Sequence, residues 1–221
     1  MIRIVIVDDQ ELVRAGLRTL AESEGDIAVV GEAATGGDAV SLVSRERPDV
    51  ALMDIRMPGL DGLEATRRIV ADPELRDVRV LVLTTFDEDE HIAAALRHGA
   101  SGYLLKDIRP GDLRHAIRVV AGGEALLSPA VTRKVIASYT SVHTRPELLG
   151  ALTDRERDVL REIALGRSNA ELAARLHISA ATARTYVSRL LAKLAARDRA
   201  QLVVLGYESG LVRPGELSAL A

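Results

Sequence analysis

Hydrophobic residues in the first 122 positions fall into five short runs, separated by longer stretches whose apolar residues recur with the period of a helix. The runs cover 4–7, 28–30, 50–53, 80–83 and 103–105. Each run is rich in Val, Ile or Leu and nearly free of charge, which is typical of strands buried on both faces. Amphipathic helices are predicted between and after them, over 10–21, 37–45, 62–71, 88–98 and 110–121.

This repeated order of strand and helix predicts an α/β domain with a doubly wound, five-stranded parallel sheet. The alternative is a helical bundle with buried apolar segments, but each run is only about as long as one strand. The pattern ends at Gly122 and Gly123, and glycine is typical of a helix terminus. We therefore predict that the first domain spans residues 1–122.

A different pattern follows. Residues 123–148 are predicted to form a linker with a helix near 128–139, and residues 215–221 a tail. Residues 149–214 lack the strand pattern and predict four short helices, near 154–165, 169–176, 180–195 and 198–209. The chain is thus predicted to join a small all-α domain to the α/β domain.

Composition narrows the function classes. The chain has no Cys, which excludes disulfides, thiolate metal sites and a cysteine nucleophile. It shows no leader pattern and no apolar run near the ~20 residues that span a bilayer, so we expect a cytoplasmic protein without a membrane partner. Residues 149–221 carry 11 Lys and Arg against 8 Asp and Glu, although the whole chain has a net charge of −3. This basic part favours a polyanionic partner.

Functional groups stand at the carboxyl ends of four of the five predicted strands. The first strand is followed by Asp8 and Asp9, and the third by Asp54. The fourth is followed by Thr84 and the fifth by Lys106. In an open parallel sheet these ends line the crevice where ligands bind. We therefore expect three carboxylates, a hydroxyl and an ammonium to lie together.

Three adjacent carboxylates repel one another unless a cation neutralises them. Mg²⁺ prefers oxygen ligands and could also bridge to a phosphoryl group, whose transfer depends on positioning and charge neutralisation. Lys106 could pair with the phosphoryl oxygens, and Thr84 could donate a hydrogen bond to one of them. The alternative role for Asp8 and Asp9, capping of the following helix, does not account for the groups at the other strand ends.

Residues 1–122 resemble the receiver domain of bacterial two-component response regulators. The resemblance rests on Asp8 and Asp9, on Asp54 within the segment 53–62 (MDIRMPGLDG), and on Thr84 and Lys106. It implies that Asp54 accepts a phosphoryl group from a sensor histidine kinase.

The same resemblance assigns roles around Asp54. It implies that Asp9, Asp54 and the backbone carbonyl of Arg56 bind Mg²⁺, and that Asp8 assists through water. It also implies that Tyr103 is an aromatic switch residue, which turns inward as Thr84 moves toward the phosphoryl group.

The helices predicted over 169–176 and 180–195 are joined by a short turn, as in a helix-turn-helix motif. The preceding helix opens with a predicted capping box of Thr153 and Glu156. The outer face of the 180–195 helix combines basic and hydroxyl side chains: Thr182, Arg184, Thr185, Tyr186, Ser188, Arg189 and Lys193. Such a face suits contacts to DNA phosphates and bases, although a solvated helix face is the alternative from the pattern alone.

Residues 149–214 resemble the LuxR-type helix-turn-helix domain of NarL/FixJ-class regulators. The matching residues include 152–156 (LTDRE), 168–173 (SNAELA) and 197–199 (RDR). The resemblance implies that Arg184, Thr185 and Ser188 face DNA bases, and that Thr182, Tyr186, Arg189 and Lys193 lie near the DNA backbone. The family usually has Glu, Val, Lys and His where this chain has Ala180, Ala183, Arg184 and Tyr186. The preferred base sequence therefore stays open.

The predicted last helix, near 198–209, has more apolar surface than so small a domain needs. We expect core packing to cover part of it and a second copy to cover the rest; the residues are Leu202, Val203, Val204, Leu205 and Tyr207. The resemblance implies a homodimer that forms on activation and binds a two-fold site in double-stranded promoter DNA.

Together these expectations describe a phosphorylation-controlled transcription regulator. It is not an enzyme with an external substrate, and at most it catalyses phosphorylation and dephosphorylation of its own Asp54. One alternative is a DNA-binding regulator whose first domain responds to a ligand or partner without phosphorylation. Another is a phosphotransfer or hydrolytic enzyme with Asp54 as nucleophile, but the sequence offers no further acid/base pair for it.

Overall fold

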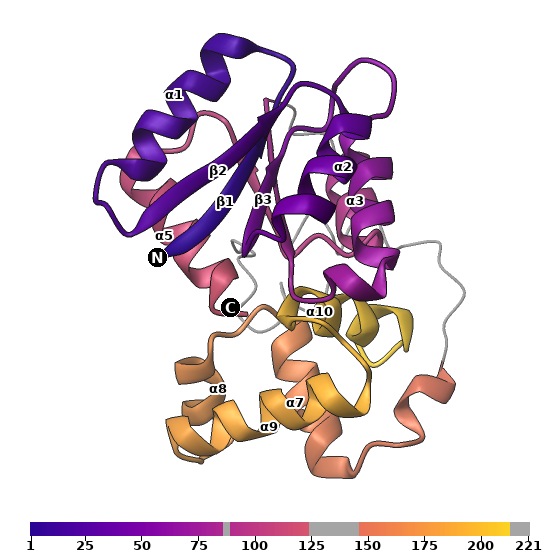
Figure 1. The fold of residues 1–221 in the computed structure, drawn as a ribbon. Helices are drawn as coiled ribbons and strands as arrows, with labels where there is room; N and C mark the ends of the chain where they lie inside the picture. The colour runs from indigo at the N-terminus through magenta and orange to yellow at the C-terminus, as the bar shows by residue number, and fades with distance from the viewer. Residues whose placement is uncertain (86–88, 124–145, 213–221) are drawn as a thin grey trace. The chain divides into compact units, whose positions relative to one another are not determined.

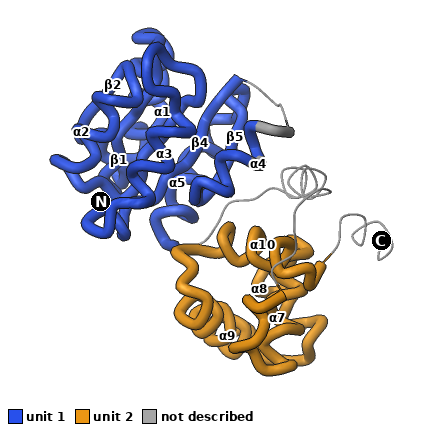
Figure 2. Tube along the Cα trace, turned by 90° about the vertical axis from the view of Figure 1, so that its right-hand side faces the viewer, with its two compact units in different colours: residues 1–126 blue, residues 127–221 orange. Residues whose placement is uncertain are grey.

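The computed structural model describes residues 1–85, 89–123 and 146–212. The chain divides into two compact units, residues 1–126 and 127–221 (Figure 2). The helix predicted near 128–139 and the tail predicted over 215–221 lie outside the described residues. The exact domain and linker bounds therefore remain predictions. In the described part of the chain, no helix is long and apolar enough to cross a membrane.

The first unit contains a five-stranded sheet in the order β2-β1-β3-β4-β5. The strands are β1 Ile2–Val7, β2 Ile27–Ala33, β3 Val50–Met53, β4 Arg79–Thr84 and β5 Gly102–Leu105. All neighbouring strands are parallel. The chain runs from β1 outward to β2 and then returns to β3 on the other side of β1. The point where the strand order reverses is where open α/β sheets bind ligands.

Helices cover both faces of this sheet (Figure 1). They are α1 Glu11–Glu22, α2 Gly36–Glu46, α3 Gly62–Ala71, α4 Asp89–Arg97 and α5 Pro110–Ala121, with a short 3-10 turn, η1, at Pro73–Leu75. α1 packs beside α5, and α2 packs beside α3. Each α-helix begins and ends within one residue of its predicted bounds, so the doubly wound parallel fold is confirmed.

The central strands are buried on both faces, as the uninterrupted apolar runs predict. In β1, residues 4–7 are at most 1% exposed, and all of β3 is buried. One face of the sheet packs against α1 and α5 through Ala21, Leu113 and Ile117. The rigid centre of the sheet therefore holds the strand ends from which the candidate site is built.

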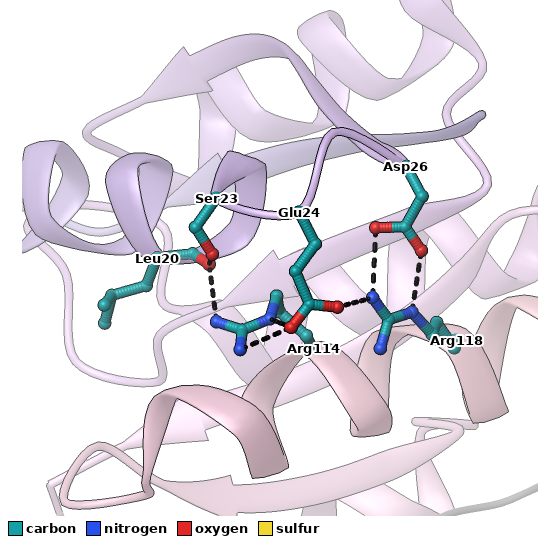
Figure 3. Close-up of polar contacts among 6 residues, drawn as sticks. All are labelled: Leu20, Ser23, Glu24, Asp26, Arg114 and Arg118. Atoms are coloured by element: carbon teal, nitrogen blue, oxygen red, sulfur yellow. Dashed lines mark hydrogen bonds and ion pairs between the residues drawn. The ribbon is translucent and has the colours of Figure 1, made fainter.

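A network of charged side chains joins the turn between α1 and β2 to α5 (Figure 3). Arg118 donates hydrogen bonds to both carboxylate oxygens of Asp26, at 2.7 and 3.0 Å, and pairs with Glu24. Arg114 donates to Glu24 at 2.9 Å and to the Leu20 carbonyl at 3.2 Å. The hydrogen bonds from Arg118 lower the pKa of both Glu24 and Asp26. These charge-assisted contacts fasten α5 to the end of α1.

The described part of the second unit is helical. It contains a 3-10 turn, η2, at Pro146–Leu149 and the helices α7 Asp154–Ala164, α8 Asn169–Arg175, α9 Ala180–Lys193 and α10 Arg199–Glu208. α7 packs against α10 and α9, and α8 packs against α9. The four predicted helices are confirmed to within two residues at each end.

Side-chain caps define where these helices begin. Thr153 and Glu156 form the predicted capping box at α7. Ser168 and Glu171 form a second capping box at α8. Ser179 caps α9, as expected, and accepts a hydrogen bond from the Thr182 backbone. These caps satisfy backbone N–H groups that have no partner within the helix.

α10 lies close against α7, with Gly206 facing Ala164 at the contact. Leu202, Val203 and Tyr207 on α10 are buried. The expectation of extra exposed apolar surface on this helix was therefore wrong for these side chains, because α10 is a packed helix of the domain core. Leu205 on the same helix stays partly exposed, and the homodimer remains a prediction.

Replacement of Gly206 by Ala should destabilise the second unit. The added Cβ would lie 2.5 Å from the Ala164 Cβ, and such overpacking costs about 1–3 kcal/mol. Thermal unfolding of the full chain measures the effect. Gly16→Ala in α1 is the matched control, since its Cβ meets no atom within 4 Å, and it should preserve or raise stability. Equal unfolding temperatures for Gly206→Ala and the original chain would contradict this packing.

Candidate functional site

The hydrogen-bonding pattern of the sheet extends one residue past the strands and positions the predicted polar residues. The Asp8 backbone N–H donates to the carbonyl of Ala33, the last residue of β2, at 3.1 Å. The Asp54 N–H donates to the Val7 carbonyl at 2.9 Å. The Lys106 N–H donates to a carbonyl of β4 at 2.8 Å. These bonds fix the backbone of the residues that follow β1, β3 and β5.

Lys106 joins the two buried carboxylates of this edge. Its Nζ lies 2.8 Å from Oδ2 of Asp54 and 2.5 Å from Oδ2 of Asp8. Asp8 is 1% exposed and Asp54 5% exposed. The other carboxylate oxygen of Asp54 accepts a hydrogen bond from the Ile55 backbone at 2.8 Å. The predicted convergence of acidic and basic groups at the strand ends is therefore present in the structure.

Three carboxylates form a cluster that could hold a cation. One oxygen from each of Asp8, Asp9 and Asp54 lies within 4.8 Å of the others. Asp9 is exposed, so the cluster opens to solvent on its side. An all-oxygen set of this kind matches the preference of Mg²⁺.

Neither Asp8 nor Asp9 is the N-cap residue of α1. The N-cap of α1 is Gln10, and its side chain makes no capping hydrogen bond. Asp8 accepts a hydrogen bond from the Gln10 backbone at 3.0 Å, which shapes the turn before the helix. The capping alternative therefore does not explain the acidic pair.

The electrostatics of the pocket set Asp54 apart. Burial raises the pKa of Asp54, and the hydrogen bond from Lys106 only partly opposes this rise. Burial lowers the pKa of Lys106, but hydrogen bonds to Asp54 and Asp8 outweigh it, so that the pKa is raised. Lys106 thus remains an ammonium, and its positive charge opposes the effect of burial on the pKa of Asp54.

The remaining predicted residues of this site belong to β4 and β5 or follow β3. Thr84 ends β4 and is buried, and Tyr103 on β5 is 1% exposed. Arg56 is exposed and follows Asp54 by two residues. The structure thus joins Asp54 to Lys106 directly, while the roles assigned to Thr84, Tyr103 and Arg56 remain predictions.

Gly62 supports the loop after Asp54, a role that sequence reasoning did not identify. Its N–H donates to the Ile55 carbonyl at 2.8 Å. A Cβ at this position would lie 1.8 Å from the Asp54 carbonyl oxygen. The sequence offered one signal for this role, a glycine directly after Asp61. Asp61 is the N-cap of α3, and its side chain accepts a hydrogen bond from the Glu64 backbone N–H. The close approach of the two backbone segments appears only in the folded chain.

The outer face of α9 presents most of the predicted DNA-contacting residues to solvent. Ala183 and Leu190 are buried on its inner face. The exposed residues are Thr182, Arg184, Thr185, Ser188, Arg189 and Lys193, while Tyr186 is partly buried. The helix therefore separates an apolar face from a basic, hydroxyl-rich face.

The basic side chains of the second unit differ in whether they contact other described residues. Arg155 donates to the Leu176 carbonyl at 2.7 Å, and Lys193 contacts Glu156. Arg184 and Arg189 make no hydrogen bond or ion pair with any part of the chain that the structure describes. These two guanidinium groups are the α9 cations available for an external anion.

Two family descriptions match the chain. The response regulator receiver domain matches residues 4–118, and the LuxR family of bacterial regulatory proteins matches residues 150–205. The transcriptional regulatory protein YhcZ of Bacillus subtilis is 43% identical over 217 residues, covering 98% of this chain and 99% of YhcZ. The response regulator VraR of Staphylococcus aureus is 38% identical over 212 residues, covering 96% of this chain and 99% of VraR.

A solved structure agrees with this assignment. The response regulator ChrA, of a heme-sensing two-component system, is 34% identical and matches with a TM-score of 0.52 over 96% of this chain and 98% of its own. Both domains and their order are thus shared with known regulators along nearly the whole chain. The chain belongs to the two-component response regulators that join a receiver domain to a LuxR-type DNA-binding domain.

Proposed function

We propose that Asp54 accepts a phosphoryl group from a sensor histidine kinase, and that this event controls dimerisation and sequence-specific DNA binding. The observation that carries the proposal is the contact of the Lys106 ammonium with both Asp54 and Asp8 at the strand ends. A buried carboxylate with an adjacent ammonium is suited to receive a phosphoryl group, because the cation can pair with the incoming oxygens.

Mg²⁺ fits the donor set of this pocket. Asp9, Asp54 and the backbone carbonyl of Arg56 would hold the ion, with Asp8 assisting through water. The three carboxylates within 4.8 Å support this assignment. When bound, the ion supplies positive charge that neutralises the carboxylates and the phosphoryl oxygens.

The side chains of the pocket have separate roles in phosphoryl transfer. An oxygen of Asp54 bonds to phosphorus as the donor's leaving group departs in line. Lys106 then pairs with the phosphoryl oxygens, and the Thr84 hydroxyl donates a hydrogen bond to one of them. Tyr103, buried on β5, repacks with Thr84 and alters the receiver surface near β5.

α9 is the DNA-reading element in this proposal. The N-terminal part of α9 enters the major groove first, and Arg184, Thr185 and Ser188 face the bases. Thr182, Tyr186 and Arg189 lie near phosphates. Two observations support these assignments: the face is exposed, and Arg184 and Arg189 have no partner among the described residues. A homodimer would place two copies of α9 on a two-fold site.

Phosphorylation should raise the affinity for DNA. We expect about a tenfold decrease in Kd after treatment with acetyl phosphate and Mg²⁺, within the usual range of allosteric coupling. The probe is the labelled duplex that the full chain enriches from a random-sequence library, and fluorescence anisotropy measures its Kd. Equal affinities before and after confirmed phosphorylation would favour the alternative regulator, whose receiver acts without phosphorylation.

A further inference from the structure

Lysine is rare in this chain. Only Lys106, Lys134 and Lys193 are found among its 29 basic residues, and the others are arginine. Lys106 touches two buried carboxylates in the receiver. Lys193 likewise touches a buried carboxylate, that of Glu156, in the DNA-binding domain. A compact ammonium, unlike a planar guanidinium, can fit among several donors that converge on one oxygen.

The contact between Lys193 and Glu156 joins two helix ends. Lys193 is the last residue of α9, and its Nζ lies 2.7 Å from Oε2 of Glu156 in the first turn of α7. The same oxygen accepts hydrogen bonds from the backbone N–H and the hydroxyl of Thr153, both at 2.9 Å. Lys193 also donates to the Ala151 carbonyl at 3.4 Å. The hydrogen bonds from Lys193, first, and from Thr153 together lower the pKa of Glu156 to about 2.

The neighbouring residue of α7 holds the chain just before the other end of α9. Arg155 donates to the carbonyl of Leu176, the C-cap of α8, three residues before the Ser179 cap of α9. The first turn of α7 therefore contacts the chain before α9 through Arg155 and the last turn of α9 through Glu156.

We propose that Lys193 is a positioning residue, which sets the orientation of α9 through Glu156, and does not contact DNA phosphate. This inference rests on the proposed role of α9 in reading DNA. It replaces the expectation that Lys193 lies at the DNA backbone. The charge of Lys193 is already matched inside the domain, whereas Arg184 and Arg189 have no such partner among the described residues.

The two roles predict opposite effects of removing the Glu156 charge. In Glu156→Gln, the side-chain oxygen can still accept from Thr153, so the cap persists while the ion pair is lost. If Lys193 positions α9, this variant weakens DNA binding. If Lys193 contacts phosphate, the variant frees its ammonium and tightens binding. The E171Q variant is the matched control, because Glu171 makes the same capping contacts with Ser168 and forms no ion pair with a lysine or arginine among the described residues.

The experiment measures Kd of the full chain for the selected duplex over a series of salt concentrations. We expect Lys193→Gln and Glu156→Gln each to weaken binding about fivefold, and the double variant to be no weaker, because both remove one interaction. The slope of log Kd against log salt should stay unchanged in Lys193→Gln. Arg189→Gln provides the reference, since loss of one phosphate contact lowers the slope by about 0.9. E171Q should keep the original Kd.

Tighter binding by Glu156→Gln, or a slope lowered by about 0.9 in Lys193→Gln, would overturn the proposal. So would independent, additive losses in the two single variants. Circular dichroism and thermal unfolding establish whether each variant is folded. If Lys193→Gln does not fold, the Glu156→Gln result alone decides between the two roles. Failure of the unsubstituted chain to enrich any duplex would instead refute the proposed role of α9, which separates the two hypotheses.

Discussion

Asp54→Asn should reduce phosphoryl uptake from acetyl phosphate and Mg²⁺ to background. The substitution keeps the size of the side chain and removes the nucleophilic carboxylate, so the Lys106 ammonium would face an amide. Asp54 is buried beside this ammonium, and no other carboxylate has the same position after β3. Intact-protein mass spectrometry measures the uptake directly, because each transferred group adds a fixed mass.

Asp49→Asn is the control for this prediction. Asp49 precedes β3, at the end opposite Asp54, where it accepts a hydrogen bond from the Arg3 backbone at 2.7 Å. The Asp49→Asn variant should therefore retain full phosphoryl uptake. Chelation of divalent ions should stop uptake by the original chain, and added Mg²⁺ should restore it. Uptake by Asp54→Asn at the rate of the original chain would remove Asp54 as the acceptor.

Gly62→Ala should both destabilise the receiver and impair phosphoryl uptake. The new Cβ would lie 1.8 Å from the carbonyl oxygen of Asp54, so the backbone of one segment must move. The position of the Cβ is fixed by its own backbone, and the atom it meets is a backbone oxygen, so no side-chain rotation can relieve the overlap. We expect a loss near the upper end of the overpacking range, about 3 kcal/mol, or a decrease in unfolding temperature of roughly 10 °C.

Thermal unfolding and the phosphoryl uptake assay together test this prediction. Gly111→Ala is the control, since Gly111 lies in the first turn of α5 and a Cβ there meets no atom within 4 Å. It should leave uptake intact. A Gly62→Ala chain that unfolds at the original temperature and takes up phosphate normally would show that the α3 start does not constrain Asp54.

Much of the fold follows from patterns that are local in the chain. A strand buried on both faces needs an uninterrupted apolar run, and a helix that covers it needs apolar residues at helical spacing. For this reason β3 and α3 match their predicted bounds completely. Caps are equally local, because Thr153 and Ser179 act within three residues of themselves.

The candidate phosphoryl site was accessible to sequence reasoning through topology. Parallel strands place their carboxyl ends on one edge, so residues as far apart as Asp8, Asp54 and Lys106 could be grouped without coordinates. Their direct contacts agree with that grouping. The apolar content of α10 misled because composition alone does not reveal which neighbour covers a helix; here α7 lies against it.

What the amino-acid sequence determined by itself was therefore the order of elements, the two kinds of domain and the groups gathered at the strand ends. Only the tertiary structure decided which side chains are engaged and which are available. Lys193 and Arg189 look alike along α9, yet one meets Glu156, 37 residues away, and the other faces solvent. The physical reason is that periodicity records which face of an element is buried, whereas an ion pair or a backbone approach depends on how two distant elements pack.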